Sequence, residues 1–126
     1  MARIEGRTDQ APAPVASYSQ AVTIGSIISV AGQAGFDPAT GELAGPDVGA
    51  QTAQTFKNIE AILAAAGATL DDVIRVDVYL STLSDFAAMN ERYATVFSAP
   101  YPTRTTVGVE LPPGMKVEIT VLAVKN

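Results

Sequence analysis

The chain has 126 residues, of which 48% are hydrophobic and 17% charged, and this composition predicts a single globular domain over residues 1–126. Its 13 acidic and 8 basic residues give a net charge of −5, and the basic residues are dispersed, which argues against a nucleic-acid partner. Cysteine and histidine are absent, which excludes disulfides, thiolate or imidazole metal ligands and every catalytic triad that uses histidine.

The N-terminal part of the chain is expected to form two strands after a short polar lead. Residues 1–7 form this lead, and residues 4–7 have the sequence IEGR, which is also a protease site used in expression vectors. The lead is therefore either native or a flexible remnant of a vector. Strands are predicted over residues 18–23 and 27–31, joined by a tight hairpin turn that begins at Gly25. Residues 32–35 are expected to leave the sheet and enter a turn-rich loop.

The middle of the chain predicts two helices with a strand between them. Asp47 is a suitable N-cap for the first helix, apolar residues recur behind it at helical spacing, and Gly67 stands where a C-terminal glycine is expected. Ser84 is expected to cap the second helix, which should end before Pro100. The strand is predicted over residues 73–80 from its alternation. The residues that share one face of it are Ile74, Val76, Val78 and Leu80.

Two more strands, over residues 103–110 and 116–124, complete a ββαβαββ order of the α+β class. Two helices can cover only one face of such a sheet. The other face carries apolar side chains beside small polar ones, and these apolar residues are Ile27, Tyr79, Leu122 and Val124. A half-apolar open face is unusual on a monomer, so this face is predicted to be buried against another subunit.

Short sequence fragments between residue 11 and the C-terminus form an ordered combination, although no single fragment is specific. They include Tyr18-Ser19-Gln20-Ala21-Val22, Val30-Ala31-Gly32-Gln33, Asp37-Pro38-Ala39-Thr40-Gly41-Glu42, Met89-Asn90-Glu91, Pro102-Thr103-Arg104-Thr105-Thr106-Val107-Gly108-Val109 and Val117-Glu118-Ile119. In this order they resemble the Rid/YjgF family, the reactive-intermediate (enamine/imine) deaminases. The resemblance implies a chorismate-mutase-like fold that assembles as a homotrimer with three clefts between subunits.

The same resemblance implies the hydrolysis of 2-imino acids, such as 2-iminopropanoate and 2-iminobutanoate, to 2-oxo acids and ammonia. This reaction needs a cation for the substrate carboxylate, an activated water and a route for protons. It needs no metal or cofactor, which suits a chain without histidine and cysteine. The sequence has no run of 18 apolar residues and no signal-peptide pattern, so no membrane partner is predicted and a cytoplasmic location is expected.

Arg104 and Glu118 are the residues expected to carry this chemistry. From position alone, Arg104 could equally pair with a surface carboxylate, and Glu118 could be a solvent-facing residue of an alternating strand. The resemblance implies instead that the planar guanidinium of Arg104 clamps the substrate carboxylate. It also implies that Glu118 positions the attacking water and handles protons.

Four further residues match positions that form the substrate site in the family. Tyr18 would cap the substrate, Gly32 would let the backbone approach it, and Asn90 stands where the family has a site asparagine. Thr106 departs from the family pattern, because many relatives carry cysteine there. Threonine still supplies the same backbone amide, so the departure leaves the substrate preference open.

Other functions remain compatible with the sequence. A trimer that binds 2-oxo acids or other small carboxylates without catalysis, as a sensor or partner protein, would use Arg104 equally well, although Glu118 favours an enzyme. A specialised deaminase of aminoacrylate-type intermediates has no separate sequence signature here. A ribonuclease activity, known of some relatives, is disfavoured by the acidic balance and the absence of histidine.

Overall fold

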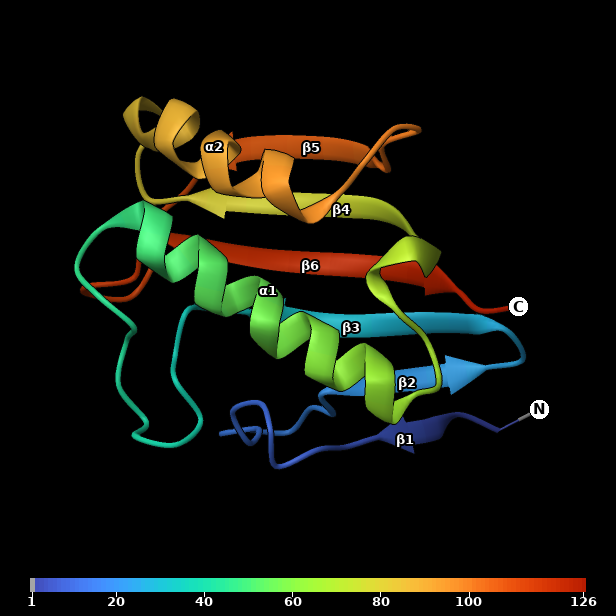
Figure 1. Ribbon diagram of the computed structural model, residues 1–126. Helices are drawn as coiled ribbons and strands as arrows, with labels where there is room; N and C mark the ends of the chain where they lie inside the picture. The colour runs from blue at the N-terminus through green and yellow to red at the C-terminus, as the bar shows by residue number, and fades with distance from the viewer. Residues whose placement is uncertain (1) are drawn as a thin grey trace.

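Six strands form one sheet, and both long helices lie on the same face of it (Figure 1). The structure is a computed structural model and describes residues 2–126. The strands are ordered β1-β2-β3-β6-β4-β5 across the sheet, and β4 and β5 run parallel while the other neighbours are antiparallel. In chain order the elements are β1 (Ile4–Gly6), β2 (Ala21–Ile24), β3 (Ile27–Gln33), α1 (Val48–Ala65), β4 (Val73–Leu80), α2 (Phe86–Val96), β5 (Thr103–Gly108) and β6 (Val117–Val124).

The polar lead contributes a strand that the sequence did not predict. Strand β1 pairs antiparallel with β2, with Ile4 opposite Thr23, and Gly6 is buried next to Ala21. Three residues are too few to show the alternation by which strands are recognised. The expected ββαβαββ order therefore gains an edge strand at its start, and residues 4–6 belong to the sheet rather than to a flexible lead.

Strand β2 begins at Ala21, not at Tyr18, because the chain before it runs as a loop fastened by Gln20. The Gln20 side chain is buried, and its amide nitrogen donates to the carbonyl oxygens of Pro12 at 2.8 Å and Thr8 at 3.1 Å, while its Oε1 accepts from the Thr8 N–H at 2.8 Å. The hairpin turn after β2 is as predicted, since Gly25 has φ +59°.

Strand β3 continues to Gln33, so the prediction that residues 32–35 leave the sheet is wrong for Gly32 and Gln33. The pairing of β3 with β6 shifts register between Val30 and Gln33, which marks a β-bulge. A bulge adds a residue to one strand and interrupts the alternation of its faces. It leaves Gly32 exposed beside β6 while Gln33 returns to the buried face.

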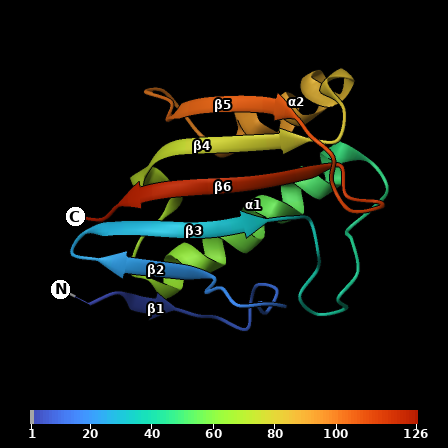
Figure 2. The same ribbon diagram turned by 180° about the vertical axis from the view of Figure 1, so that it is seen from behind.

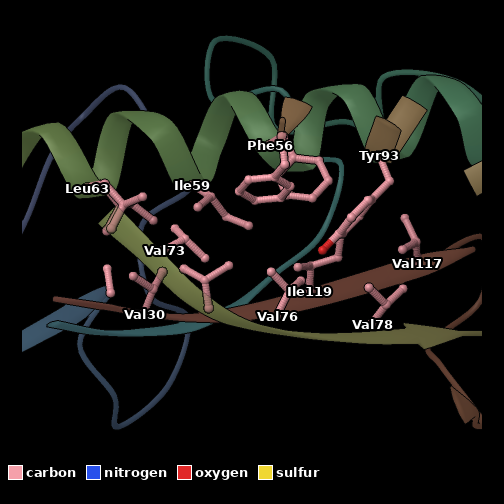
Figure 3. Packing of buried hydrophobic residues seen from close by; sticks show 14 of the residues in the cluster. Val30, Phe56, Ile59, Leu63, Val73, Val76, Val78, Tyr93, Val117 and Ile119 are labelled. Carbon is pink, nitrogen blue, oxygen red and sulfur yellow. The ribbon is translucent and has the colours of Figure 1, made fainter. Parts of the chain in front are cut away.

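Helix α1 has the predicted ends and packs its apolar side against the core of the sheet. The Asp47 carboxylate accepts a hydrogen bond from the Ala50 N–H at 2.9 Å, and Gly67 has φ +82°, as a C-terminal glycine should. Figure 3 shows Phe56, Ile59 and Leu63 of this helix pointing at apolar side chains of the sheet. Those sheet residues include Val30, Val76, Val78, Val117 and Ile119.

Strand β4 and helix α2 differ from the prediction at one residue each. A register shift between Val73 and Arg75 leaves Ile74 half exposed and turns Val73 to the buried face instead. Ser84 does not cap α2; it lies in a 3₁₀ turn over Leu83–Asp85 whose N-cap is Thr82, and the Thr82 hydroxyl accepts from the Ser84 N–H at 3.3 Å.

The face of the sheet away from the helices is open along its whole width (Figure 2). On β6, Val117, Ile119, Val121 and Ala123 are buried under the helices, as predicted from their alternation. The side chains of Ile27 and Val124 on the opposite face remain 52% and 38% exposed. Within residues 2–126, no helix has the length and apolarity that a membrane crossing requires.

Candidate active site

Arg104 and Glu118 lie on opposite faces of the sheet. Residues that stand opposite each other on neighbouring strands share a face. Arg104 stands opposite Val76, which is buried under the helices, so its side chain is on the helix-covered face at the edge strand β5. Glu118 stands opposite Tyr79, which puts it on the open face. A single copy of the chain therefore keeps the two residues apart.

The Arg104 side chain lies on helix α2 in a cage of neutral groups. Its Nη1 donates to the Asn90 Oδ1 at 2.7 Å, and its guanidinium carbon is 4.4 Å from the ring centre of Tyr93 and 5.2 Å from that of Phe86. Arg104 makes no ion pair with any carboxylate of residues 2–126. A half-buried cation held only by an amide oxygen and ring faces keeps its charge free for an anion.

A cavity of about 480 Å³ opens at this cation, and Asn90, Tyr93, Tyr101 and Arg104 line it. The Tyr93 side chain is buried, and burial raises its pKa, an effect that the nearby charge of Arg104 only partly offsets. The phenol is therefore neutral at physiological pH, and Arg104 is the charged group of the cavity. This cavity is suited to hold a carboxylate but contains no general base.

Glu118 borders a second cavity of about 510 Å³ on the open side, together with Tyr18 and Gly32. The absence of a side chain at Gly32 makes room for the carboxylate, because a Cβ there would lie 2.7 Å from Glu118 Oε2. Tyr18 is held in the loop before β2, where its hydroxyl accepts from the Val15 N–H at 3.4 Å. The charged residues lining this cavity are acidic, so it can hold a water and a base but no substrate carboxylate.

The structure thus sorts five of the six predicted site residues into two groups. Arg104 and Asn90 meet at the helix-covered edge, whereas Tyr18, Gly32 and Glu118 meet on the open side. Thr106 stands opposite Val78 on β5, on the same face as Arg104, and lines neither of the two cavities.

Two contributions to the site were missed by sequence reasoning. Tyr93 was not among the predicted site residues, and its helical spacing could not show that one face of its ring supports Arg104. Gln20 was part of the recognised fragments, but its role in fastening the loop that carries Tyr18 depends on contacts with residues 8–12. An internal glutamine next to a strand is the one signal that could have suggested such a role.

Comparison with known proteins decides the family. Residues 8–125 match the family described as Endoribonuclease L-PSP. The chain belongs to this family, the Rid/YjgF family. It is 47% identical over 120 residues to a RutC family protein of Pyrococcus horikoshii, covering 94% of this chain and 95% of the relative.

Two further relatives connect the Rid family to an activity and to the fold. A 2-iminobutanoate/2-iminopropanoate deaminase of Salmonella typhimurium is 39% identical over 123 residues, covering 94% of this chain and 95% of that protein. The crystal structure of RidA from the Antarctic bacterium Psychrobacter sp. superimposes with a TM-score of 0.92 at 47% identity, covering 97% of this chain and 99% of that one. The predicted α+β, Rid-type fold is confirmed.

Proposed function

We propose that this Rid-family chain hydrolyses 2-imino acids to 2-oxo acids and ammonia, as a 2-iminobutanoate/2-iminopropanoate deaminase. The observation that carries the proposal is the division of the site between two cavities. One cavity holds the cation Arg104 but no general base, and the other holds the base Glu118 but no cation. A 2-imino acid has an anionic carboxylate next to an electrophilic C=N carbon, so it needs both halves at once. The relative from Salmonella typhimurium named for this activity supports the proposal.

The chemistry assigns a role to each half. The Arg104 fork binds the substrate carboxylate, and Asn90 fixes the orientation of that fork. Glu118 takes a proton from water as the water oxygen bonds to the imine carbon, and the C=N electron pair moves to nitrogen. Glu118 returns the proton to this nitrogen, which gives a carbinolamine. It then transfers the hydroxyl proton to the same nitrogen, so that the C–N bond breaks, the C=O bond forms and ammonia leaves. Tyr18 and Gly32 shape the space around the reacting carbon, and the Thr106 amide adds a donor near the carboxylate.

The division of the site also requires a second copy of the chain. Apolar side chains are exposed on the open face and also along the edge formed by the turn before α2, the segment that leads into β5, and β5 itself. On this edge Leu83, Tyr101 and Val107 are 56%, 61% and 37% exposed. Placing the edge of one copy on the open face of the next brings Arg104 of one subunit to Glu118 of another. A head-to-tail contact forms a closed ring when the rotation between copies closes, and we propose that it closes here as a homotrimer with three sites.

The test generates the imine in situ with a pyridoxal-phosphate-dependent dehydratase and follows its disappearance. Arg104→Ala should lower kcat/KM at least about a hundredfold, and Arg104→Lys should recover little, because a point charge does not replace the bidentate fork. Arg92→Ala, which changes an exposed arginine of helix α2 that lies outside both cavities, is the control and should keep full activity. Wild-type activity in Arg104→Ala would show that the carboxylate binds elsewhere.

A carboxylate-binding protein without catalysis is the second candidate, because the Arg104 cage alone can hold a small anion. Glu118→Gln separates the two candidates, since glutamine keeps the shape of the side chain but cannot take a proton. For an enzyme, turnover should fall about 10²–10⁴-fold while binding of 2-oxobutanoate, measured by calorimetry, is retained. If the wild-type protein binds the oxo acid but hydrolyses no imine, the binding function is correct.

A further inference from the structure

We propose that Gln51 of helix α1 is a positioning residue, which holds the start of β6 and with it the carboxylate of Glu118. This inference rests on the proposed imine hydrolysis, in which Glu118 is the base. Gln51 was not among the predicted site residues and lines neither cavity. Its side chain is 0% exposed, whereas glutamine is mostly found at the surface. An amide buried this deeply requires hydrogen-bond partners.

The amide of Gln51 finds its partners in the segment that leads into β6. Its Nε2 donates to the carbonyl oxygen of Gly114 at 3.0 Å, and its Oε1 accepts from the Lys116 N–H at 2.8 Å. These two backbone groups are two residues apart, and the amide bonds to them as a neighbouring strand would. The same Nε2 donates to the carbonyl oxygen of Gly45 at 2.9 Å. One side chain therefore ties the loop before α1 to the segment before Glu118.

The start of β6 has support from only one neighbouring strand. Pairing of β3 with β6 ends at Gln33 opposite Ile119, so within residues 2–126 Glu118 is paired with β4 alone. The carbonyl oxygen of Lys116 accepts from the N–H of the residue that follows β4, at 3.1 Å. The N–H of Lys116 is held by Gln51. Without this side chain, the segment before Glu118 would lose its attachment to helix α1.

The backbone of Gln51 contacts the strand on the other side of Glu118. Gly35 follows β3, and a Cβ there would lie 2.6 Å from the carbonyl oxygen of Gln51 and 2.7 Å from its Cα, so the chain leaving β3 passes directly against α1. Gly32 of the same strand is the residue that makes room for the Glu118 carboxylate. Gln51 therefore touches both segments whose relative position places Glu118 beside Gly32.

The experiment measures kcat for imine hydrolysis and the affinity for 2-oxobutanoate in Gln51→Met. Methionine is also long and unbranched but cannot replace the amide, so the Lys116 N–H loses its partner. We expect kcat to fall about tenfold or more, since a misplacement of about 1 Å can cost about a hundredfold in rate. The affinity for 2-oxobutanoate should change less than about twofold, because Arg104 binds the carboxylate.

A matched control separates positioning from a general loss of stability. Ile62 is fully buried on the same helix and lines neither cavity. Ile62→Ala should lower the melting temperature, because it leaves a void in the core, and should keep the wild-type kcat well below that temperature. Native mass spectrometry confirms that each variant has the assembly of the wild type.

Two other substitutions of Gln51 distinguish the role of the amide. Gln51→Asn keeps an amide that is one methylene too short for Lys116, so its kcat should fall as in Gln51→Met. Gln51→Glu still accepts from the Lys116 N–H, and its protonated form, which burial favours, also donates to one carbonyl oxygen. Gln51→Glu should therefore keep a kcat several-fold above that of Gln51→Met. If Gln51→Met does not fold, Gln51→Asn takes its place in every comparison.

A double variant shows whether Gln51 acts through Glu118. In the Glu118→Gln protein, adding Gln51→Met should lower the residual kcat by less than about twofold, because both substitutions act on one group. A merely structural role would lower the residual kcat by the full factor seen in the single variant. That result, or a kcat of Gln51→Met equal to that of Ile62→Ala, would overturn the inference and leave the deaminase function in place. Absence of imine hydrolysis by the wild-type protein would overturn the deaminase function and the inference with it.

Discussion

At the scale of single residues, the guanidinium of Arg104 is held by neutral partners only. The Asn90 amide fixes its direction, and the rings of Tyr93 and Phe86 lie against it at 4.4 and 5.2 Å. Cation–π contacts contribute about 0.5–2 kcal/mol without neutralising the charge, whereas a carboxylate partner would compete with the ligand. The ring of Tyr93 should therefore matter to binding, and its hydroxyl should not.

Substitutions of Tyr93 test this division. Its hydroxyl is buried and has no hydrogen-bond partner within residues 2–126, so Tyr93→Phe should keep the affinity for 2-oxobutanoate and stabilise the protein by up to about 1 kcal/mol. Tyr93→Leu removes the stacked ring and should weaken binding about fivefold or more. The measurements are urea unfolding and calorimetric titration.

Phe97→Leu is the matched control for the loss of a ring. Phe97 packs in the same aromatic cluster, 5.2 Å from Tyr93 and 5.6 Å from Phe56 between ring centres, but has no contact with Arg104 recorded among these residues. It should destabilise the fold by about 1–3 kcal/mol and leave the affinity unchanged. Equal affinities in Tyr93→Leu and the wild type would show that the stacking does not position Arg104.

At the scale of elements, the bulge of β3 positions Glu118 of β6. Gly32 does not have a positive φ, so Gly32→Ala introduces no backbone strain there, but the new Cβ would stand 2.7 Å from Glu118 Oε2 and displace the carboxylate. We expect kcat to fall about tenfold or more while the free energy of unfolding changes by less than about 1 kcal/mol. Adding Gly32→Ala to Glu118→Gln should cause little further loss of kcat, because both act on one group. Additive losses in kcat would contradict a role for Gly32 through Glu118.

The elements that could be predicted from sequence are those with long local signals. Helix α1 has a cap at Asp47, a regular apolar spacing and a terminal glycine, and β6 alternates over its full length. The strand of residues 4–6 and the bulges near Gly32 and Ile74 could not be predicted, because each depends on pairing with a distant strand. These bulges decide which side chains reach the open face.

The candidate site was predictable only as a set of residues. The resemblance to the Rid/YjgF family identified Arg104 and Glu118 as site residues. Nothing local in the sequence showed that the two residues lie on opposite faces of the sheet. That arrangement follows from the register of β4 with β5 on one side and with β6 on the other. The Tyr93 ring could not be assigned to the site because the same helical spacing also predicts a core residue.

At the scale of the whole molecule, the account depends on a site shared between two copies. Arg104 points to the helix-covered side of an edge strand and Glu118 to the open face, so one subunit must supply the carboxylate clamp and its neighbour the base. A cyclic trimer repeats this contact three times. Native mass spectrometry of the wild-type protein should show a trimer. Only if the chain forms this trimer can two variants combine in one mixed assembly.

The most direct test mixes two variants that are each inactive, Arg104→Ala and Glu118→Gln, by co-expression or by joint refolding. In a random mixture at equal amounts, half of the clamps and half of the bases are intact, so about one quarter of the sites combine an intact Arg104 with an intact Glu118 from the neighbour. We predict that the mixture recovers about a quarter of wild-type imine hydrolysis. If native mass spectrometry shows mixed trimers and the mixture stays as inactive as either variant alone, the site is not shared between subunits and the account is wrong.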